Sequence, residues 1–201
     1  EADFNRLGLQ SFRKLRLVTQ ARLNLCQTYP NHLLVPADVD DRDLVAVSKY
    51  RSKQRIPAVS WFDVRTGAHI ARCAQPMAGV NSRRCAEDER LVALLAGLTA
   101  RETVNEAGDV VWAKCTYYII DARSKVASRG NQLMGKGVEQ AKHYRDGRYA
   151  TELLHMNIGN IHAVRESFDA VHALHRPGAP ELSSGGYLGK LDASGWLAHV
   201  H

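Results

Sequence analysis

The sequence predicts an α/β domain in which flanking helices cover a central mixed sheet. Short segments rich in β-branched and aromatic residues alternate along the chain with amphipathic segments of helical period, which is the pattern of α/β folds. Hydrophobic residues make up 45% of the 201 residues, enough to fill a core, and charged residues make up an ordinary 24%. The sequence shows no internal repeat and no long linker, and its length is enough for one large domain or for part of a bigger one.

The first third of the chain is predicted to form two strands and a helix. Leu23–Cys26 has the composition of a strand, which Pro30 interrupts because the residue before a proline is held extended. A second strand at Leu33–Val35 stops at Pro36. The acidic segment Asp38–Asp43 then opens a helix, since carboxylates favour the positive end of the helix dipole. Four cations gather where this helix ends and complement its dipole there: Lys49, Arg51, Lys53 and Arg55.

The next segments predict a hairpin and a second helix. Ile56–Trp61 and His69–Cys73 are rich in β-forming residues and flank a Thr-Gly turn signal, so we expect them to pair. Glu87–Arg101 alternates charged residues with leucines at helical spacing, which predicts an amphipathic helix.

The remainder is organised around one apolar run and one capped helix. Val110–Asp121 carries consecutive β-branched and aromatic residues and is predicted to be a buried central strand. Leu153–Ile158 is a second apolar segment. Asn160, a preferred N-cap residue, is expected to open a helix. We expect irregular structure at four places: 105–109, 129–137, 176–178 and 183–189.

Charge and cysteine content limit the expected partners and cofactors. The net charge of +6 favours anionic partners. No apolar stretch is long enough to span a bilayer, so any membrane contact is expected to be peripheral. The four cysteines lack Cys-x2-Cys spacing and no signal peptide is visible, so we expect reduced thiols in the cytosol. No metal or other cofactor is expected, because His172 and His175 have no carboxylate or thiol partner at a suitable spacing.

The glycine-rich run from Gly130 to Gly137 is close to a nucleotide-binding P-loop. A P-loop ends in a Ser or Thr that ligates magnesium, and Gly137 stands at that place. We therefore do not expect a nucleotide site here.

Short motifs follow one another along nearly the whole chain, in this order: Asn24-Leu-Cys-Gln-Thr-Tyr-Pro30, Arg55-Ile-Pro-Ala-Val-Ser-Trp61, Ala71-Arg-Cys-Ala-Gln-Pro76, Ile120-Asp-Ala-Arg123, Asn131 with Gly135-Lys-Gly137 and Glu139, Asn157-Ile-Gly-Asn-Ile-His162, and Ser194-Gly-Trp-Leu-Ala-His199. This order resembles the myotubularin family, whose members remove the 3-phosphate from membrane phosphoinositides. The resemblance implies a cysteine-phosphatase-like α/β domain that is incomplete at the C-terminus. Residues 1–201 would be the N-terminal portion of that domain.

The nucleophilic Cys-x5-Arg loop of the family does not occur in these residues. The residues six positions after the four cysteines are His32, Gly79, Leu91 and Asp121. The resemblance therefore places the catalytic loop beyond His201.

The resemblance also places two side-chain amides in the substrate pocket, those of Asn131 and Asn160. An amide can donate to phosphate or inositol hydroxyls without adding charge. Composition alone allows other roles, since Asn131 stands beside glycines typical of a turn and Asn160 precedes a helix as an N-cap. Capping and anion binding can coexist at a helix start. We expect the two asparagines to approach each other around one concave surface.

The implied function is removal of the 3-phosphate from phosphatidylinositol 3-phosphate and phosphatidylinositol 3,5-bisphosphate. The partners would be the phosphoinositide headgroup and an anionic membrane surface, touched peripherally at endosomes in the cytoplasm. Homo- or heterodimerisation would use regions outside this chain. The alternative is a catalytically inactive scaffold or adaptor of the same family. Nucleic-acid binding would depend on charge alone, and we do not expect it.

Overall fold

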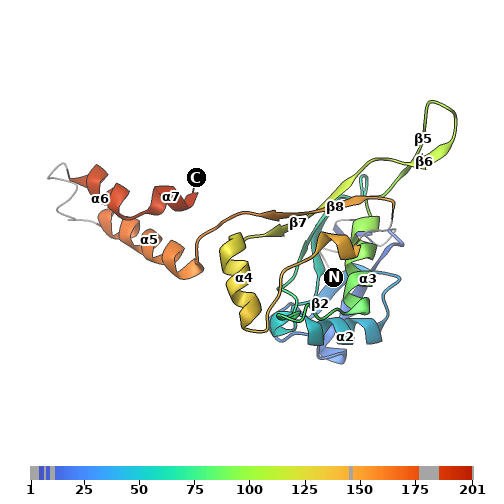
Figure 1. The fold of residues 1–201 in the computed structure, drawn as a ribbon, viewed down its shortest axis with the longest axis horizontal. Helices are drawn as coiled ribbons and strands as arrows, with labels where there is room; N and C mark the ends of the chain where they lie inside the picture. The colour runs from blue at the N-terminus through green and yellow to red at the C-terminus, as the bar shows by residue number, and fades with distance from the viewer. Residues whose placement is uncertain (1–4, 7, 10–11, 145–146, 177–185, 201) are drawn as a thin grey trace. The chain divides into compact units, whose positions relative to one another are not determined.

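The computed structural model describes residues 5–6, 8–9, 12–144, 147–176 and 186–200. The chain divides into two compact units, which are taken separately below. The first comprises residues 1–119 with 128–154, and the second comprises residues 120–127 with 155–201. Helices and strands alternate along the chain, which confirms the predicted α/β class (Figure 1).

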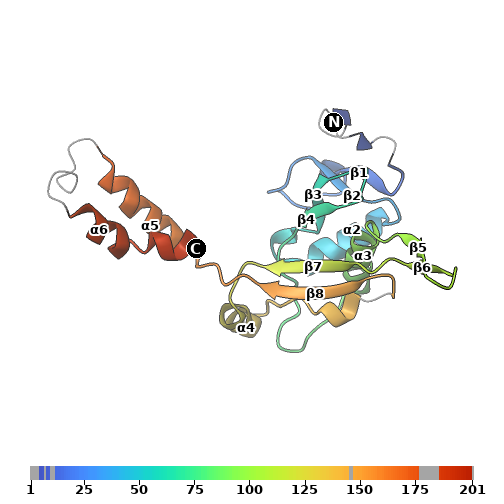
Figure 2. The same ribbon diagram turned by 90° about the horizontal axis from the view of Figure 1, so that it is seen from above.

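The first unit is built on a four-stranded antiparallel sheet in the order β1-β2-β3-β4 (Figure 2). Its strands are β1 (Leu15–Thr19), β2 (His32–Pro36), β3 (Ala58–Phe62) and β4 (His69–Arg72). The predicted strand at Leu33–Val35 and the predicted hairpin are confirmed. In the hairpin Ala58 lies opposite Arg72 and Phe62 opposite His69, with a register shift between Val59 and Trp61.

The strand predicted at Leu23–Cys26 is wrong, because the first strand ends at Thr19. A short 3-10 helix, η2 (Gln20–Arg22), follows it, and residues 23–26 lie in turn and coil. Leu25 is only 1% exposed, so its apolar character marks a buried loop. The Gln20 side chain holds this loop by accepting from the Cys26 backbone N–H at 3.0 Å and donating to the Tyr29 carbonyl at 2.6 Å. These bonds satisfy backbone groups that strand pairing would otherwise satisfy.

Two helices pack with the sheet into one core: α2 (Asp41–Tyr50) and α3 (Ala86–Gly97). Asp40 caps α2, as the acidic segment predicted, by accepting from the Asp43 backbone N–H at 2.8 Å. The helix predicted at Glu87–Arg101 is confirmed but ends earlier, at Gly97. The core residues contributed by the helices are almost completely buried: Leu44, Val47, Leu91 and Leu95.

The first unit also contains shorter elements. They are the 3-10 helices η3 (Ser52–Gln54) and η4 (Ala141–Tyr144) and a hairpin of β5 (Glu102–Val104) and β6 (Val110–Trp112). This hairpin extends away from the body of the unit (Figure 1). Its polar connection agrees with the predicted loop character of the segment between the two strands.

The central strand predicted at Val110–Asp121 is wrong. The run divides into β6, which pairs with β5, and β7 (Thr116–Asp121), which pairs with β8 (Ala150–His155). Val110 is 66% exposed and Ile120 is 64% exposed. A continuous apolar run does not specify how many neighbours a strand has, and among the described residues each of these strands has one.

The glycine-rich segment 129–137 also differs from expectation, because helix α4 (Lys125–Leu133) extends through its first half. In the second unit, Asn160 precedes helix α5 (Ile161–Leu174), as predicted. Helix α6 (Tyr187–Ala193) begins within the predicted loop 183–189, of which residues 183–185 lie outside the described residues. Helix α7 (Trp196–Val200) was not expected.

Aromatic contacts join the helices of the second unit. The Phe168 ring of α5 meets the Trp196 ring of α7 edge-on, with centroids 5.6 Å apart. The Tyr187 hydroxyl of α6 lies 3.1 Å from Nε2 of His175, the residue after α5. His175 is therefore engaged in packing α6.

Candidate functional site: the Asn131 segment and its buried support

Asn131 lies in the last turn of α4, where a Schellman motif ends the helix. Its backbone carbonyl accepts from the Lys136 N–H at 3.2 Å, and the Gln132 carbonyl accepts from the Gly135 N–H at 3.1 Å. Gly135 has the positive φ of 77° that this motif requires. The Asn131 side chain is half-buried and makes no hydrogen bond within the described part of the chain. The motif therefore fixes the backbone of Asn131 and leaves its amide available to a ligand.

The turn after α4 packs closely against the segment from Pro76 to Gly79. The Gly79 N–H donates to the Lys136 carbonyl at 3.2 Å, and the Gln132 side chain donates to the Gly79 carbonyl at 3.3 Å. A Cβ on Gly137 would lie 2.8 Å from the Ala78 Cβ and 2.9 Å from the Pro76 carbonyl oxygen. Glycine is therefore required at position 137, because the backbone there lies directly against the segment from Pro76 to Gly79. This close packing, and not nucleotide binding, explains the glycine that makes the sequence resemble a P-loop.

A buried ion cluster stands behind this turn, formed by Arg51, Asp88, Glu139 and Tyr144. Arg51 donates to both carboxylate oxygens of Asp88, at 2.7 and 2.6 Å, and to the Ala74 carbonyl at 3.0 Å. Its third nitrogen also donates to Glu139. The Tyr144 hydroxyl donates to the other oxygen of Glu139. The side chains of Arg51, Asp88 and Glu139 are 0%, 1% and 10% exposed.

The charged groups of the cluster are stabilised by one another, because they are shielded from solvent. Burial raises the pKa of Asp88, and the Arg51 charge and hydrogen bonds oppose that rise. Burial acts to lower the pKa of Arg51, but Glu139, Cys73 and Asp88 together raise it well above the ordinary value. Arg51 therefore stays protonated between its two carboxylates.

Sequence reasoning missed this cluster. It grouped Arg51 with three other cations at the end of α2, yet Arg51 is the buried member of that group. The ion pair joins residues 88 positions apart, so no local pattern could reveal it. Only Glu139 gave a hint in the sequence, because this acidic residue of the 131–139 motif has no cation directly beside it in the chain to pair with.

Asn160, the second predicted site residue, caps helix α5 in the second unit. Its side-chain oxygen accepts from the His162 backbone N–H at 3.0 Å, and the residue is exposed. The N-cap interpretation is therefore confirmed, and the amide NH2 group still points to no partner in the described residues. Asn131 belongs to the first unit and Asn160 to the second, so their approach around one concave surface stays a prediction.

The motif Ile120-Asp-Ala-Arg123 forms a local clamp. Arg123 donates to the two carboxylate oxygens of Asp121 at 2.9 and 2.6 Å, and its backbone N–H donates to the same carboxylate at 3.0 Å. Partial burial acts to raise the pKa of Asp121, but the hydrogen bonds and charge of Arg123 outweigh it and lower the pKa. The carboxylate is thus held ionised and engaged, which is a structural role and not that of an acid catalyst.

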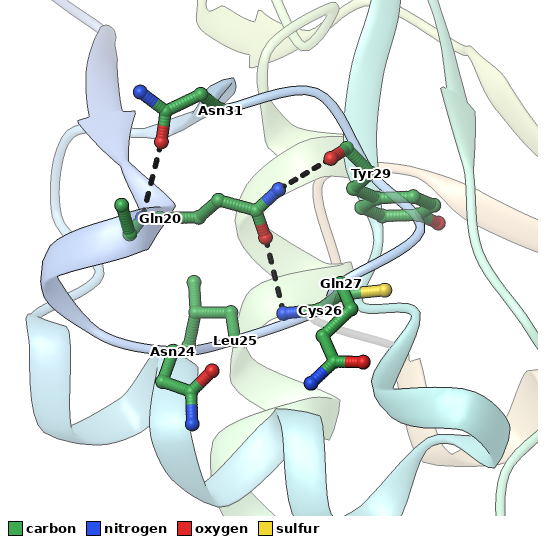
Figure 3. A pocket seen from close by; sticks show the side chains of 8 residues that line it. Gln20, Asn24, Leu25, Cys26, Gln27, Tyr29 and Asn31 are labelled. Carbon is green, nitrogen blue, oxygen red and sulfur yellow. Dashed lines mark hydrogen bonds between the residues drawn. The ribbon is translucent and has the colours of Figure 1, made fainter.

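An open hollow of 290 Å³ lies in the loop after β1 (Figure 3). Its polar lining includes Gln20 and Asn31, whose amides are already bonded to the backbone of the loop. Asn24 and Gln27 complete the set of amides, and no Asp, Glu, Lys, Arg or His is among the lining residues, so no nucleophile lies beside a base here. The hollow is a product of how the loop is folded, and we assign no chemistry to it.

Comparison with known proteins decides the family. A family profile described as "Myotubularin-like phosphatase domain" matches residues 1–201. The chain belongs to the myotubularin family. It is 32% identical over 201 residues to the human protein named Phosphatidylinositol-3,5-bisphosphate 3-phosphatase MTMR8, covering 99% of this chain and 26% of that protein. It is 35% identical over 199 residues to the rat (Rattus norvegicus) protein named Myotubularin, covering 98% of this chain and 30% of that protein.

This myotubularin-family chain therefore spans about 26–30% of the length of these relatives. None of its four cysteines, all of which lie in the described residues, forms a disulfide: Cys26 is buried, Cys73 exposed, and Cys85 and Cys115 half-buried. Burial raises the pKa of Cys85 to about 11, which disfavours the nucleophilic thiolate. In the described part of the chain no group of His, Cys, Asp or Glu side chains could hold a metal, and no helix is long and apolar enough to cross a membrane.

Proposed function

We propose that this chain is part of a phosphoinositide 3-phosphatase that acts on phosphatidylinositol 3-phosphate and phosphatidylinositol 3,5-bisphosphate. The observation that carries the proposal is the family match over all 201 residues, together with relatives named for 3-phosphatase activity on the bisphosphate. The residues of this chain would form walls of the headgroup pocket, with Asn131 and Asn160 as substrate contacts. A thiolate and arginine from a Cys-x5-Arg loop would perform the transfer.

The state of Asn131 supports its role. The fold uses its carbonyl to end α4 but leaves its side-chain amide without a hydrogen bond in the described residues. An amide held on a fixed backbone can donate to an inositol hydroxyl or a phosphate oxygen at little cost in ordering. Asn160 adds a second amide at the start of a helix, where N–H groups and the dipole favour an anion.

We propose further that the protein contacts endosomal membranes peripherally from the cytoplasm. The net charge of +6 supports this, since basic surfaces are attracted to anionic lipid. Dimerisation through regions outside these residues belongs to the same proposal. Co-sedimentation of the full-length protein with vesicles, with and without anionic lipid, tests the membrane contact. Binding that is equal on neutral and anionic vesicles would contradict it.

The activity is tested by phosphate release from vesicles containing one phosphoinositide at a time. The full-length protein should release phosphate from phosphatidylinositol 3-phosphate and the 3,5-bisphosphate but not from phosphatidylinositol 4-phosphate. Headgroup binding without any release would instead establish the inactive scaffold. If the full-length protein neither binds the headgroup nor releases phosphate, the proposed function is refuted. The family membership would still stand.

A further inference from the structure

The segment from Asn131 to Glu139 is fixed at both of its ends. At the first end, the Asn131 carbonyl closes the Schellman motif with Lys136. In the middle, Gly137 lies against Pro76 and Ala78 too closely for any other residue. At the far end, the Glu139 carboxylate is held from two sides by Arg51 and Tyr144. Asn131 is therefore connected to a buried cation through a short stretch of restrained backbone.

Arg51 is itself immobilised by the core. Its paired bonds to Asp88 attach it to α3, and its bond to the Ala74 carbonyl attaches it to the segment after β4. The crevice beside the cluster has a volume of about 10 Å³, room for a single water. That crevice, which borders Asp88 and Tyr144, is too small for a ligand larger than water. The charges of the cluster pair with one another across parts of the protein.

We propose that Arg51 and Glu139 form a positioning pair that holds Asn131 at the inositol headgroup. The proposal rests on the proposed function, and it names a residue pair that does not itself touch substrate. Arg51 would then contribute to substrate recognition indirectly. If its contact with Glu139 is lost, the 131–139 segment can shift, and the Asn131 amide no longer meets the hydroxyl or phosphate oxygen that it must bind.

Glu139 is the member of the pair that can be removed with least damage to the core. After Glu139→Ala, Arg51 still faces Asp88 as a neutral pair and still donates to Ala74. Glu139→Gln keeps the shape and can accept from Arg51 while donating to the Tyr144 oxygen. The two variants therefore separate loss of the tether from loss of one charge.

The measurement is calorimetric binding of soluble inositol 1,3-bisphosphate to the full-length protein. Glu139→Ala should weaken binding by roughly tenfold, the loss of about one well-placed hydrogen bond. Glu139→Gln should stay within about threefold of the parent protein. Asp43→Ala is the matched control, because it removes an ion pair between α2 and α3, that of Asp43 with Arg90, without touching the 131–139 segment. Its binding should be unchanged.

A double variant distinguishes positioning from general loosening of the fold. If Glu139 acts through Asn131, Glu139→Ala should cost nothing further once Asn131→Ala has removed the amide. Tyr144→Phe is a gentler variant that removes only the hydroxyl holding Glu139, and should weaken binding by about threefold even if Glu139→Ala folds poorly.

The outcomes are distinguishable. A parent protein that does not bind the headgroup refutes the proposed function and this proposal with it. A parent that binds while Glu139→Ala and Tyr144→Phe bind equally well refutes the positioning pair alone. A loss from Glu139→Ala that persists in the Asn131→Ala background, or a Glu139→Gln variant as weak as Glu139→Ala, also refutes it.

Discussion

Removing the buried cation tests the energetics of the cluster directly. Arg51→Met keeps an unbranched side chain of comparable reach but leaves the Asp88 carboxylate, with a side chain 1% exposed, without its two charge-assisted bonds. Removing one partner of a buried ion pair typically costs about 3–5 kcal/mol, because the remaining charge is uncompensated. For a cooperatively unfolding unit of roughly 150–250 residues, each kcal/mol lowers Tm by about 2–4 °C, so we expect a fall of roughly 6–20 °C.

The assay is thermal unfolding of the full-length protein followed by tryptophan fluorescence, with Arg51→Met/Asp88→Leu beside the single variant. If the cost comes from the stranded charge, the double variant should recover at least about half of the lost Tm, since apolar replacement of a buried pair is often neutral. If the cost comes only from lost packing, the double variant should be no better. A single variant within about 2 °C of the parent would refute the argument that the Arg51 charge holds the cluster together.

Three further predictions follow from the local geometry. Gly137→Ala should lower stability by about 1–3 kcal/mol, because the added Cβ would meet Ala78 and Pro76. The control Gly130→Ala, where α4 has open space, should be neutral or stabilising by up to about 1 kcal/mol. Equal melting temperatures for the two variants would contradict the close approach at Gly137. Asn160→Asp should keep the N-cap of α5, and so the stability of the protein, but lose headgroup affinity. Asn160→Ala should lose the cap as well as the affinity, with a stability cost of about 1 kcal/mol. Full headgroup affinity in the Asp variant would show that Asn160 acts only as a cap. Burial lowers the pKa of His69 in the folded chain, although its bond to the Gly67 carbonyl opposes this. As pH falls, His69 therefore takes up a proton in the unfolded chain before it does so in the folded chain. The stability that neutral His69 contributes is complete above about pH 6.5 and is lost as pH falls below that value. The melting temperature should therefore fall less steeply between pH 7 and 5 in His69→Gln than in the parent or in the exposed control His32→Gln. Equal slopes of melting temperature against pH in all three proteins would exclude His69 as the cause.

The parts of the fold that sequence predicted are those with local signals. Pro36 marked the end of β2, Asp40 and its acidic neighbours marked the start of α2, and Thr66-Gly67 marked the hairpin turn. Each signal acts within a few residues, so it survives whatever the rest of the chain does.

The errors share a different origin. Leu25 and Cys26 looked like a strand because they are apolar, but burial alone does not require pairing, and the Gln20 amide satisfies the backbone beside them. Val110–Asp121 looked like one central strand because periodicity cannot count neighbours or detect the break before Thr116. At the candidate site, the cap at Asn160 was predictable from residue type, whereas the Arg51–Glu139 contact depends on tertiary structure.

The order in which the buried charges meet has a consequence for folding during synthesis. Residues 9–98 contain nearly the whole core of the first unit, and within them Asp88 already neutralises Arg51. At about 5–20 residues per second, Glu139 is made several seconds after Asp88. The nascent chain can thus close its sheet and two helices around a neutral pair while the third charge is still in the ribosome. Glu139 then brings the Asn131 segment onto a surface that has already formed, so the proposed headgroup contact is assembled after the scaffold that supports it.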